Sequence, residues 1–241
     1  MIRVTLLAAL FTLALGLPAA LAQFVVIESA APGIAPGLVV EPGQSLTVPA
    51  GASVTLIGQD GTPVTLTGPY QGAPEAPKGA AGGSKLIATL SHLVGSAGSD
   101  ATALGAMRAA IQTGNPPSPW AIDVDRSGAQ CAMAGSAPKL WMSKAPAKAV
   151  TLKIKATGGM GSGGGSANVS WAPGATTAAW PDRLALDDGA DYLLRVSGGM
   201  NAAKVTIRLV PDGLPSDAHK AAWMADQGCE SQARALLASL N

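Results

Sequence analysis

Two cysteines are the residues of this chain best suited to covalent chemistry. Cys131 and Cys229 are the only cysteines in the sequence, and neither belongs to a Cys-x-x-Cys pair. In an oxidising compartment such a pair is expected to form one disulfide, whereas two unlinked thiols are the alternative. The bond would close a loop of about 100 residues and stabilise the fold by roughly 4 to 5 kcal/mol. We expect the disulfide, and we do not expect a catalytic thiol.

A short acidic segment has the ligand spacing of a calcium site. Asp123, Asp125 and Ser127 place side-chain oxygens at alternate positions, and Gly128 follows, as in the first half of a calcium-binding loop. The position that should supply a bidentate glutamate is Ala134. Because that ligand and the flanking helices are missing, we interpret the segment as a polar hairpin turn.

Motifs for phosphate binding and for acyl transfer are incomplete. The glycine-rich segment before Lys85 has Ser84 where a phosphate loop needs glycine. Ser136 and Lys139 have the Ser-x-x-Lys spacing of penicillin-interacting enzymes, but Pro138 forbids the helix that would bring them together. No Gly-x-Ser-x-Gly element occurs. The sequence therefore predicts no catalytic, cofactor-binding or metal-binding residue.

Histidines are too few for most enzyme sites. His92 and His219 are the only two, and each lies in a segment predicted to be helical. A zinc site would lack ligands if the cysteines are bonded. We therefore favour a protein without enzymatic activity, and a hydrolase with a carboxylate-based site that shows no motif stays an alternative.

Tryptophans are the remaining candidates for recognition. Four of the five lie on or beside predicted strands: Trp120, Trp141, Trp171 and Trp180. Buried indoles would pack in a core and make one hydrogen bond each. Exposed neighbours would instead form an aromatic binding surface. Both interpretations stay open, and we retain these four residues as a possible binding surface.

The first 22 residues have the pattern of a secretory signal peptide. Arg3 precedes an apolar run over residues 4 to 17, and Ala20-Leu21-Ala22 is a small-x-small cleavage site. A membrane anchor is the alternative, but the run is shorter than the roughly 20 residues of a spanning helix. We expect cleavage after Ala22 and a periplasmic or secreted protein with no membrane span after cleavage.

The charge balance argues against two classes of partner. The loss of Arg3 from 16 basic residues leaves 15, which match the 15 acidic residues. Nucleic acids and anionic membrane surfaces both require a concentrated basic field. Because the mature chain is neutral, we expect neither as a partner.

The N-terminal part is predicted to form short strands separated by turns. Asp60-Gly61 between two alternating apolar runs is a strong hairpin signal. The predicted strands are residues 24 to 29, 37 to 40, 45 to 48, 52 to 57 and 63 to 67. Together they predict a small β module over residues 23 to 70.

Two turn motifs of the N-terminal part stand out, residues 49 to 53 (Pro-Ala-Gly-Ala-Ser) and Asp60-Gly61. With these motifs, the segment from residue 36 to 69 resembles the short-stranded β repeat of FecR-type periplasmic domains. That family shows a glycine-led strand, a turn, and two strands joined by Asp-Gly in the corresponding places. The resemblance implies an exported cell-envelope protein. The chain shows no long run of further repeats and no cytoplasmic and transmembrane portion like those of the signalling members, so the resemblance does not extend to regulation of a sigma factor.

The middle of the chain is predicted to be a linker. Residues 71 to 119 are rich in Gly and Pro at both ends. Between them, apolar residues at helical spacing predict one helix after Ser84 and a second from about residue 99 to 111.

The C-terminal part is predicted to be a β-sandwich over residues 120 to 211, followed by a helical pair over residues 212 to 241. Ser216 or Asp217 would cap the first helix, and Gly228 would end it. The predicted strands are residues 120 to 124, 129 to 133, 139 to 142, 149 to 156, 166 to 171, 177 to 180, 191 to 197 and 204 to 210. Their regular spacing indicates two antiparallel sheets.

These patterns predict a mainly β protein, with a small N-terminal β module, an antiparallel β-sandwich, and short helices in the linker and at the C-terminus. Non-catalytic β modules bind other molecules through strand edges and loops. We therefore predict a protein-binding scaffold or adaptor of the cell envelope, with an envelope protein as partner and no cofactor. A small-ligand or carbohydrate-binding module is a second alternative beside the hydrolase.

Overall fold

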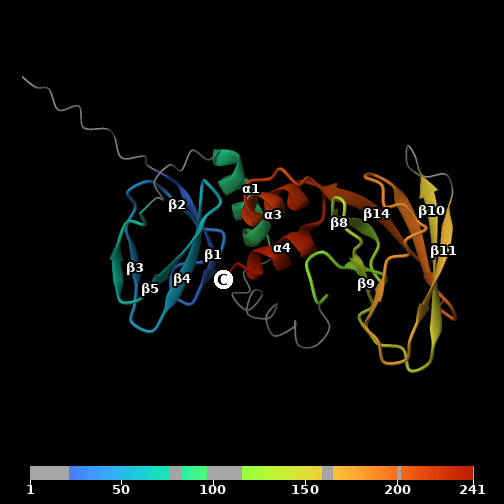
Figure 1. The fold of residues 1–241 in the computed structure, drawn as a ribbon. Coiled ribbons are helices and arrows are strands. Elements are labelled where there is room, and N and C mark those ends of the chain that lie inside the picture. Colours follow the sequence, from blue (N-terminus) through green and yellow to red (C-terminus); the bar gives the residue numbers. More distant parts are fainter. Residues whose placement is uncertain (1–21, 76–82, 97–115, 159–164, 200–201, 241) are drawn as a thin grey trace, which may run out of the picture.

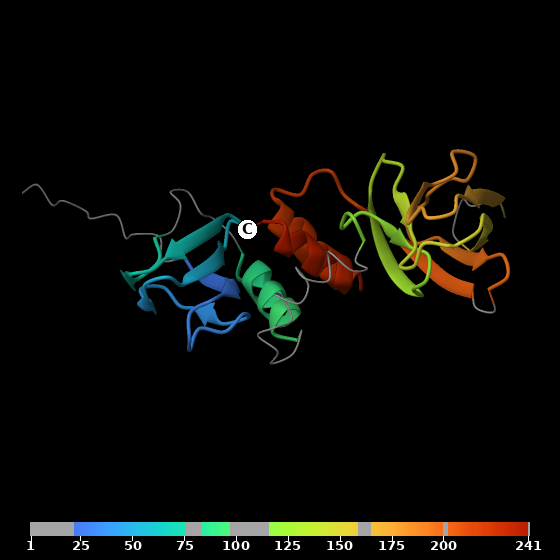
Figure 2. The ribbon, with the colours of Figure 1, turned by 90° about the horizontal axis from the view of Figure 1, so that it is seen from below.

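The computed structural model is mainly β, with three short helices in the part of the chain that it describes (Figure 1). Two β modules lie at opposite ends of the molecule, and the helices lie between them (Figure 2). The predicted signal peptide and the predicted helix from about residue 99 to 111 lie outside the described residues. Those residues are 22 to 75, 83 to 96, 116 to 158, 165 to 199 and 202 to 240.

The N-terminal module consists of two small antiparallel sheets. The larger has the strand order β2-β1-β4-β5, and the smaller pairs β3 with β6. Side chains from both sheets, such as Val26, Leu46 and Leu56, are buried in one core. The strands are β1 (Phe24–Ser29), β2 (Val39–Val40), β3 (Leu46–Val48), β4 (Ser53–Gly58), β5 (Pro63–Thr67) and β6 (Tyr70–Gly72).

Strand β6 corrects the predicted boundary after residue 70. Tyr70, Gln71 and Gly72 pair with Val48, Thr47 and Leu46 of β3, so the module continues into the segment interpreted as a linker. A three-residue strand is too short to show the alternation by which strands are recognised in a sequence. Its pairing depends on β3, which is far away in the chain.

The hairpin between β4 and β5 forms at the predicted Asp-Gly turn. The Asp60 carboxylate accepts hydrogen bonds from the backbone N–H and the hydroxyl of Thr62, at 3.0 and 2.7 Å. Gly61 has φ of +80°, a left-handed conformation that glycine adopts without a steric penalty. The local sequence therefore specifies this turn.

The C-terminal module is a sandwich of a five-stranded and a three-stranded sheet. Their orders are β11-β10-β13-β14-β8 and β12-β9-β7. Residues from both sheets, including Leu140, Leu152 and Trp171, share one core. The strands are β7 (Ile122–Asp123), β8 (Gly128–Met133), β9 (Lys139–Trp141), β10 (Val150–Gly158), β11 (Ser166–Trp171), β12 (Thr177–Ala179), β13 (Asp191–Val196) and β14 (Ala202–Val210).

Most strand pairs are antiparallel, as predicted, but two are parallel. Strand β14 pairs with β8 in parallel, and β7 pairs with β9 in parallel. Alternation of apolar and polar residues shows which face of a strand is buried, but it carries no information on the direction of the neighbouring strand. The two parallel pairs therefore follow from the tertiary arrangement.

The helices form a layer that joins the two modules. They are α1 (Ser84–Gly95), α3 (Asp217–Asp226) and α4 (Glu230–Ala238). Their apolar faces share one buried cluster with Val25 and Ile27 of β1 and with Cys131 of β8 and Val210 of β14. In β1, Phe24 and Val26 face the module's own core while Val25 and Ile27 face the helices, so four consecutive apolar residues are buried. No helix among the described residues is long and apolar enough to cross a membrane.

The first C-terminal helix begins and ends near the predicted residues. The hydroxyl of Ser216 accepts a hydrogen bond from the backbone N–H of His219 at the start of α3. Gly228 has φ of +83° just after that helix, the usual conformation of a glycine that follows a helix end. Helix α4 then starts at Glu230, whose carboxylate pairs with Arg234 one turn later.

The predicted disulfide is present. Cys131 on β8 is bonded to Cys229, which directly precedes α4. Beside the bond, the buried Gln232 side chain accepts a hydrogen bond from the backbone N–H of Cys131 at 2.7 Å and donates to its carbonyl oxygen at 2.8 Å. It also donates to the carbonyl oxygen of Pro119 at 2.8 Å. The C-terminal helices are therefore attached to the sandwich by a covalent bond and by a polar network.

Candidate binding surface

The five-stranded sheet has one buried face and one exposed face over its central strands. Leu152 and Ile154 of β10 point into the sandwich core, whereas Lys153 and Lys155 between them are exposed. Strand β14 repeats this pattern, with Val205 buried in the same core. Because successive side chains of a strand point to opposite faces, the outward residues of β10, β13 and β14 form one continuous surface.

Basic residues gather on this outward surface. We define the basic face as Lys153 and Lys155 of β10, Leu193 and Arg195 of β13, and Lys204 and Arg208 of β14. All of these side chains are exposed except that of Arg208, which is half-buried. Asp191 is the one carboxylate at an outward position of these three strands.

The strand register brings these cations close together. Lys153 lies directly opposite Arg195, and Lys155 lies opposite Leu193. On the other side of β13, Leu193 lies opposite Lys204. Neighbouring strands are about 5 Å apart, and alternate residues of one strand are about 7 Å apart. Like charges that face each other across two strands destabilise a sheet, so the Lys153 and Arg195 pair lowers stability.

Asp191 neutralises one edge of the basic face. Its carboxylate accepts hydrogen bonds from Lys204 Nζ at 2.8 Å and from the Thr206 hydroxyl at 2.6 Å. These two bonds, the one from Lys204 foremost, hold the pKa of Asp191 below its usual value of 3.8. Arg208 is close enough to lower it further by its charge. The remaining cations have no such carboxylate on the same surface of β10, β13 or β14.

Leu193 gives the basic face an apolar centre. Its exposed fraction is 37%, and it is one of two large hydrophobic residues exposed among the described residues, with Leu38. Lys155 and Lys204 flank it on the adjacent strands. An apolar side chain surrounded by charged ones has the arrangement of a small protein interface, in which a desolvated centre is enclosed by a polar rim.

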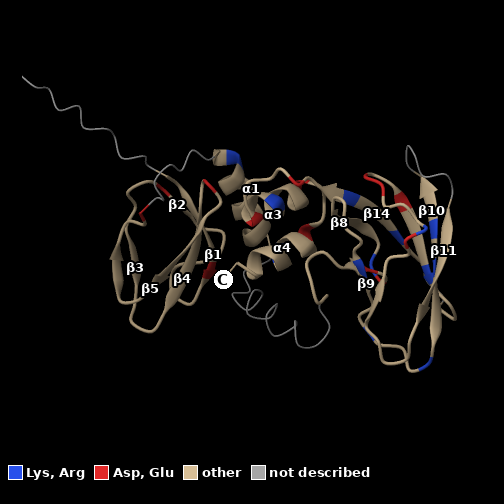
Figure 3. Ribbon diagram, viewed as in Figure 1, with Lys and Arg blue, Asp and Glu red and all other residues tan. Residues whose placement is uncertain are grey.

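Basic residues outnumber acidic ones at one end of the molecule. Between residues 116 and 211 the sequence has ten basic and six acidic residues, whereas between residues 22 and 75 it has four acidic residues and no basic one. Figure 3 shows this separation, with Lys and Arg along β10 and β14 and only acidic residues on the N-terminal module. The neutral total charge therefore conceals a charge difference between the two modules.

The four tryptophans retained from the sequence do not form an exposed surface. Trp141, Trp171 and Trp180 are buried, and Trp120 is half-buried against the helical cluster. The indole N–H of Trp171 donates to the carbonyl oxygen of Ala175 at 2.8 Å. The aromatic binding surface is therefore wrong for these residues, because burial in the cores removes more apolar area from water than a surface position would.

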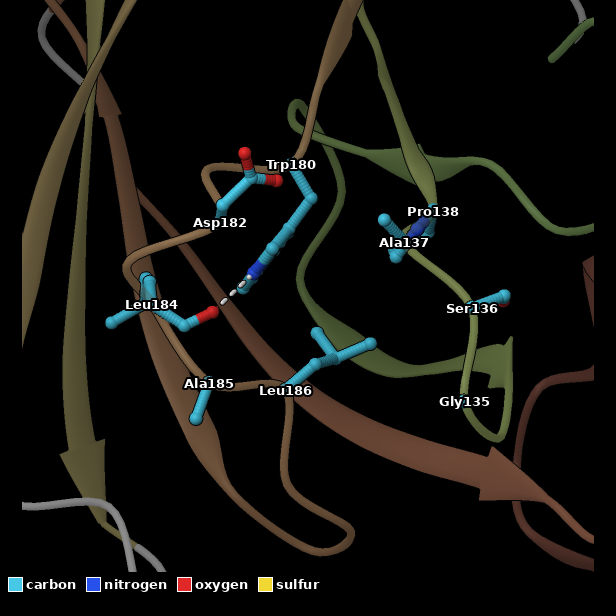
Figure 4. A pocket seen from close by; sticks show the side chains of 9 residues that line it. All are labelled: Gly135, Ser136, Ala137, Pro138, Trp180, Asp182, Leu184, Ala185 and Leu186. Atoms are coloured by element: carbon cyan, nitrogen blue, oxygen red, sulfur yellow. Dashed lines mark hydrogen bonds between the residues drawn. The ribbon is translucent and has the colours of Figure 1, made fainter.

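Trp180 forms part of the wall of a pocket of about 270 Å³ (Figure 4). Its indole N–H donates to the carbonyl oxygen of Leu184 at 2.8 Å, and its ring packs edge-on against Tyr192. Asp182 is the single ionisable residue of the lining, which otherwise consists of Gly135, Ser136, Ala137, Pro138, Leu184, Ala185 and Leu186. Ser136 and Lys139, which have Ser-x-x-Lys spacing, therefore contribute only the serine to this pocket. The lining offers no pair of groups for acid-base chemistry.

The segment with the ligand spacing of a calcium site is a turn whose carboxylates accept hydrogen bonds from other groups of the protein. Asp123 accepts a hydrogen bond from the backbone N–H of Asp125, and Asp125 accepts from the backbone N–H and the hydroxyl of Ser143. Gln130 bonds the backbone of Asp123 in both directions. Burial raises the pKa of Asp123, which disfavours the charged form that a cation would need. The interpretation as a polar turn is the one that this geometry favours.

A serine and a histidine meet at the start of α3. Ser216 Oγ lies 2.9 Å from Nδ1 of His219, and it lies 3.4 Å from the carbonyl oxygen of Gly61. The serine also caps the helix. Since no carboxylate among the described residues is bonded to His219, the pair lacks the third group that orients a catalytic histidine. It serves as a contact between the β4–β5 hairpin and the helical layer.

No group of three or more His, Cys, Asp or Glu side chains within the described ranges is arranged to hold a metal ion. Searches of protein families, of curated proteins and of solved structures found no match to this chain. The candidate site therefore rests on the geometry of the chain itself.

The basic face was missed at the level of the sequence, although part of its signal is local. Lys153 and Lys155 alternate with Leu152 and Ile154, and this alternation by itself indicates that both lysines face solvent. Arg195 and the basic residues of β14 join them only because β13 lies between β10 and β14. A total charge cannot show such a gathering.

Proposed function

We propose that this protein is an exported, non-catalytic scaffold or adaptor of the cell envelope that binds a protein partner. The helical layer carries this proposal. It shares one buried cluster with strands of both β modules, so the modules are held at fixed positions on either side of it (Figure 1). A body that presents two different surfaces at fixed positions is suited to holding partners in place.

Attachment of the helical layer favours a rigid scaffold over two modules on a loose tether. On one side, helix α1 packs on β1, and the hydroxyl of Ser91 donates to the carbonyl oxygen of Gly37 at 2.6 Å. On the other side, the disulfide and Gln232 attach α4 to β8. Arg234 of α4 donates to the carbonyl oxygen of Leu93 at the end of α1, which links the two attachments.

Export is part of the proposal, and two observations favour it. The N-terminal sequence has the pattern of a signal peptide, and the disulfide is compatible with an oxidising compartment. The FecR-like resemblance of residues 36 to 69 points to the same location, and it stays a prediction. If the proposal holds, mass spectrometry of the exported protein will find an N-terminus at Gln23.

Crosslinking in the native envelope tests the binding role. The tagged full-length protein is crosslinked in its own cells, recovered, and compared with a control that carries the signal peptide and tag alone. An amine-reactive reagent reports on the C-terminal module, but residues 22 to 75 contain no lysine. A carboxylate-reactive reagent is therefore needed for Glu28, Glu41 and Asp60. We expect one envelope protein to be enriched, with crosslinks that recur at the same residues. The absence of any enriched protein with both reagents would refute the scaffold.

A further inference from the structure

We infer that the basic face is the docking site for an acidic protein surface, in which carboxylates surround an apolar side chain that packs on Leu193. This inference rests on the proposed function, since it names the partner chemistry of the scaffold. Lys153, Lys155 and Arg195 form the main side of this surface, and Lys204, which is paired with Asp191, and Arg208 form the other side.

Charge is the first argument. The chain as a whole is almost neutral, yet three adjacent strands carry five of its 16 basic residues and a single carboxylate, that of Asp191. A surface of one sign attracts partners of the opposite sign and raises the rate of association. Lys153 and Arg195 also face each other at a cost to stability, a cost that an anionic partner would remove.

Spacing is the second argument. Lys153 and Lys155 are two positions apart on one strand, or about 7 Å. Carboxylates at alternate positions of an extended segment have the same spacing. On the adjacent strand β13, Arg195 lies beside Lys153 and Leu193 lies beside Lys155. A partner that places carboxylates around one apolar side chain matches this surface.

Leu193 favours a protein partner over other anionic molecules. Sulfated polysaccharides and anionic lipid headgroups match the charge, but neither offers an apolar side chain to cover an exposed leucine. The outward positions of β10, β13 and β14 hold no aromatic residue on which a sugar ring could stack. A protein surface satisfies both the cations and Leu193, so it is the occupant that we propose.

Binding of a synthetic peptide tests the inference. The probe alternates Glu and Thr and has one central Leu, and its affinity for the full-length mature protein is measured by fluorescence anisotropy. The Lys153→Glu and Arg195→Glu double variant is expected to weaken binding at least about tenfold. Leu193→Asn, which removes the apolar side chain without a change in net charge, is expected to weaken it several-fold. The Lys139→Glu and Lys148→Glu double variant changes the net charge equally at exposed positions away from the basic face, and it should retain the affinity within about twofold.

Each outcome has one meaning. Equal weakening by the two double variants would show a general charge effect and would overturn the inference. So would an unchanged affinity in Leu193→Asn, or the absence of peptide binding. Dextran sulfate and phosphatidylglycerol vesicles are compared in parallel, and tighter binding of either by the unmodified protein, lost in the basic-face variant, would replace the protein partner by that anion. Circular dichroism and thermal melting confirm that each variant is folded.

The scaffold and its docking site can fail separately. If the envelope partner is crosslinked as strongly to the Lys153→Glu and Arg195→Glu variant as to the unmodified protein, the scaffold stands and the basic face is not its docking site. If no envelope partner is recovered with any form of the protein, the scaffold fails regardless of the peptide result. Loss of the partner in the basic-face variant alone supports both.

Discussion

Both β modules are built from short strands around an apolar core, but the charges on their surfaces have opposite signs. The N-terminal module has four carboxylates and no basic residue between residues 22 and 75, and it contains no tryptophan. The C-terminal module has a surplus of basic residues and buries Trp171 and Trp180 in its core. Each has its own apolar core, and a third core of helices lies between them.

The modules also differ in how they are attached to that helical layer. A disulfide and the Gln232 network connect the C-terminal module. The N-terminal module is connected by apolar packing of β1 on α1 and by a few hydrogen bonds, such as that from Ser216 to Gly61. The comparison indicates that one junction is covalent and strong, whereas the other depends on packing. Three predictions test this difference, and two more concern carboxylates of the C-terminal module.

Removal of the disulfide is expected to have the largest effect. The Cys131→Ser and Cys229→Ser double variant should lose roughly 4 to 5 kcal/mol of unfolding free energy, because the bond closes a loop of about 100 residues. Tryptophan fluorescence in urea measures this loss, and it reports on the C-terminal module and α3 alone, since Trp120 is the first tryptophan in the chain. The oxidised parent treated with a reductant should behave like the variant. A loss below about 1 kcal/mol would contradict the prediction.

Leu90→Ala should have the next largest effect. Leu90 is fully buried in the helical cluster, and truncation of a buried leucine costs roughly 2 to 5 kcal/mol. Leu38→Ala is the matched control, because Leu38 is 36% exposed and should cost less than about 1 kcal/mol. Hydrogen exchange should increase in β1 and in the C-terminal helices of the Leu90 variant. An increase in exchange confined to β1 or to the C-terminal helices would mean that the helical layer does not couple the two modules.

Gly61→Ala tests the junction between the N-terminal module and the helical layer. Gly61 and Gly51 have φ of +80° and +81°, so alanine should cost roughly 1 to 2 kcal/mol at either position. A Cβ at Gly51 has no neighbour within 4 Å, whereas a Cβ at Gly61 would collide with Ser216 Oγ. Displacement of that helix cap should add about 1 kcal/mol. Urea unfolding of the Gly61→Ala and Gly51→Ala variants measures the loss of unfolding free energy in each. Equal losses would show that the β4–β5 hairpin does not contact the start of α3 closely enough to disturb its cap.

Acid titration should show the smallest effect. The hydrogen bond from Lys204 keeps the pKa of Asp191 below 3.8, so this group stabilises the fold above pH 3.8 and the contribution disappears as the pH falls through its folded pKa. Asp191→Asn should therefore flatten the dependence of stability on pH in the acid range. The effect is small because the carboxylate is partly exposed.

Asp123→Asn is expected to change the pH dependence of stability in the opposite direction to Asp191→Asn. Burial raises the pKa of Asp123 above 3.8, so its contribution is complete below pH 3.8 and is lost as the pH rises through the folded pKa. The asparagine variant should gain stability relative to the parent at neutral pH. Unfolding measured from pH 2 to 7 in both variants compares the two directions, and shifts of the same sign would contradict the assignment.

Strands, turns and caps were largely predictable because their causes are local. Strands β1, β5 and β11 have the predicted bounds, and the Asp60-Gly61 turn and the Ser216 cap occur as expected. Each depends on alternation or on one side chain within a few residues. Strand β6, the parallel pairs and the burial of the tryptophans depend on partners that are distant in the chain.

The amino-acid sequence alone predicts most of the short strands, the three described helices and the disulfide, all of which the structure contains, and it predicts a signal for export, which stays a prediction. The tertiary structure adds the helical layer as a joint between two modules, and it adds the basic face. The alternation of apolar and polar residues along each strand predicts that Lys153, Arg195 and Lys204 point to solvent. The order of the strands in the sheet brings them to the same surface. Strand order arises from the pairing of distant segments, and no local pattern encodes it.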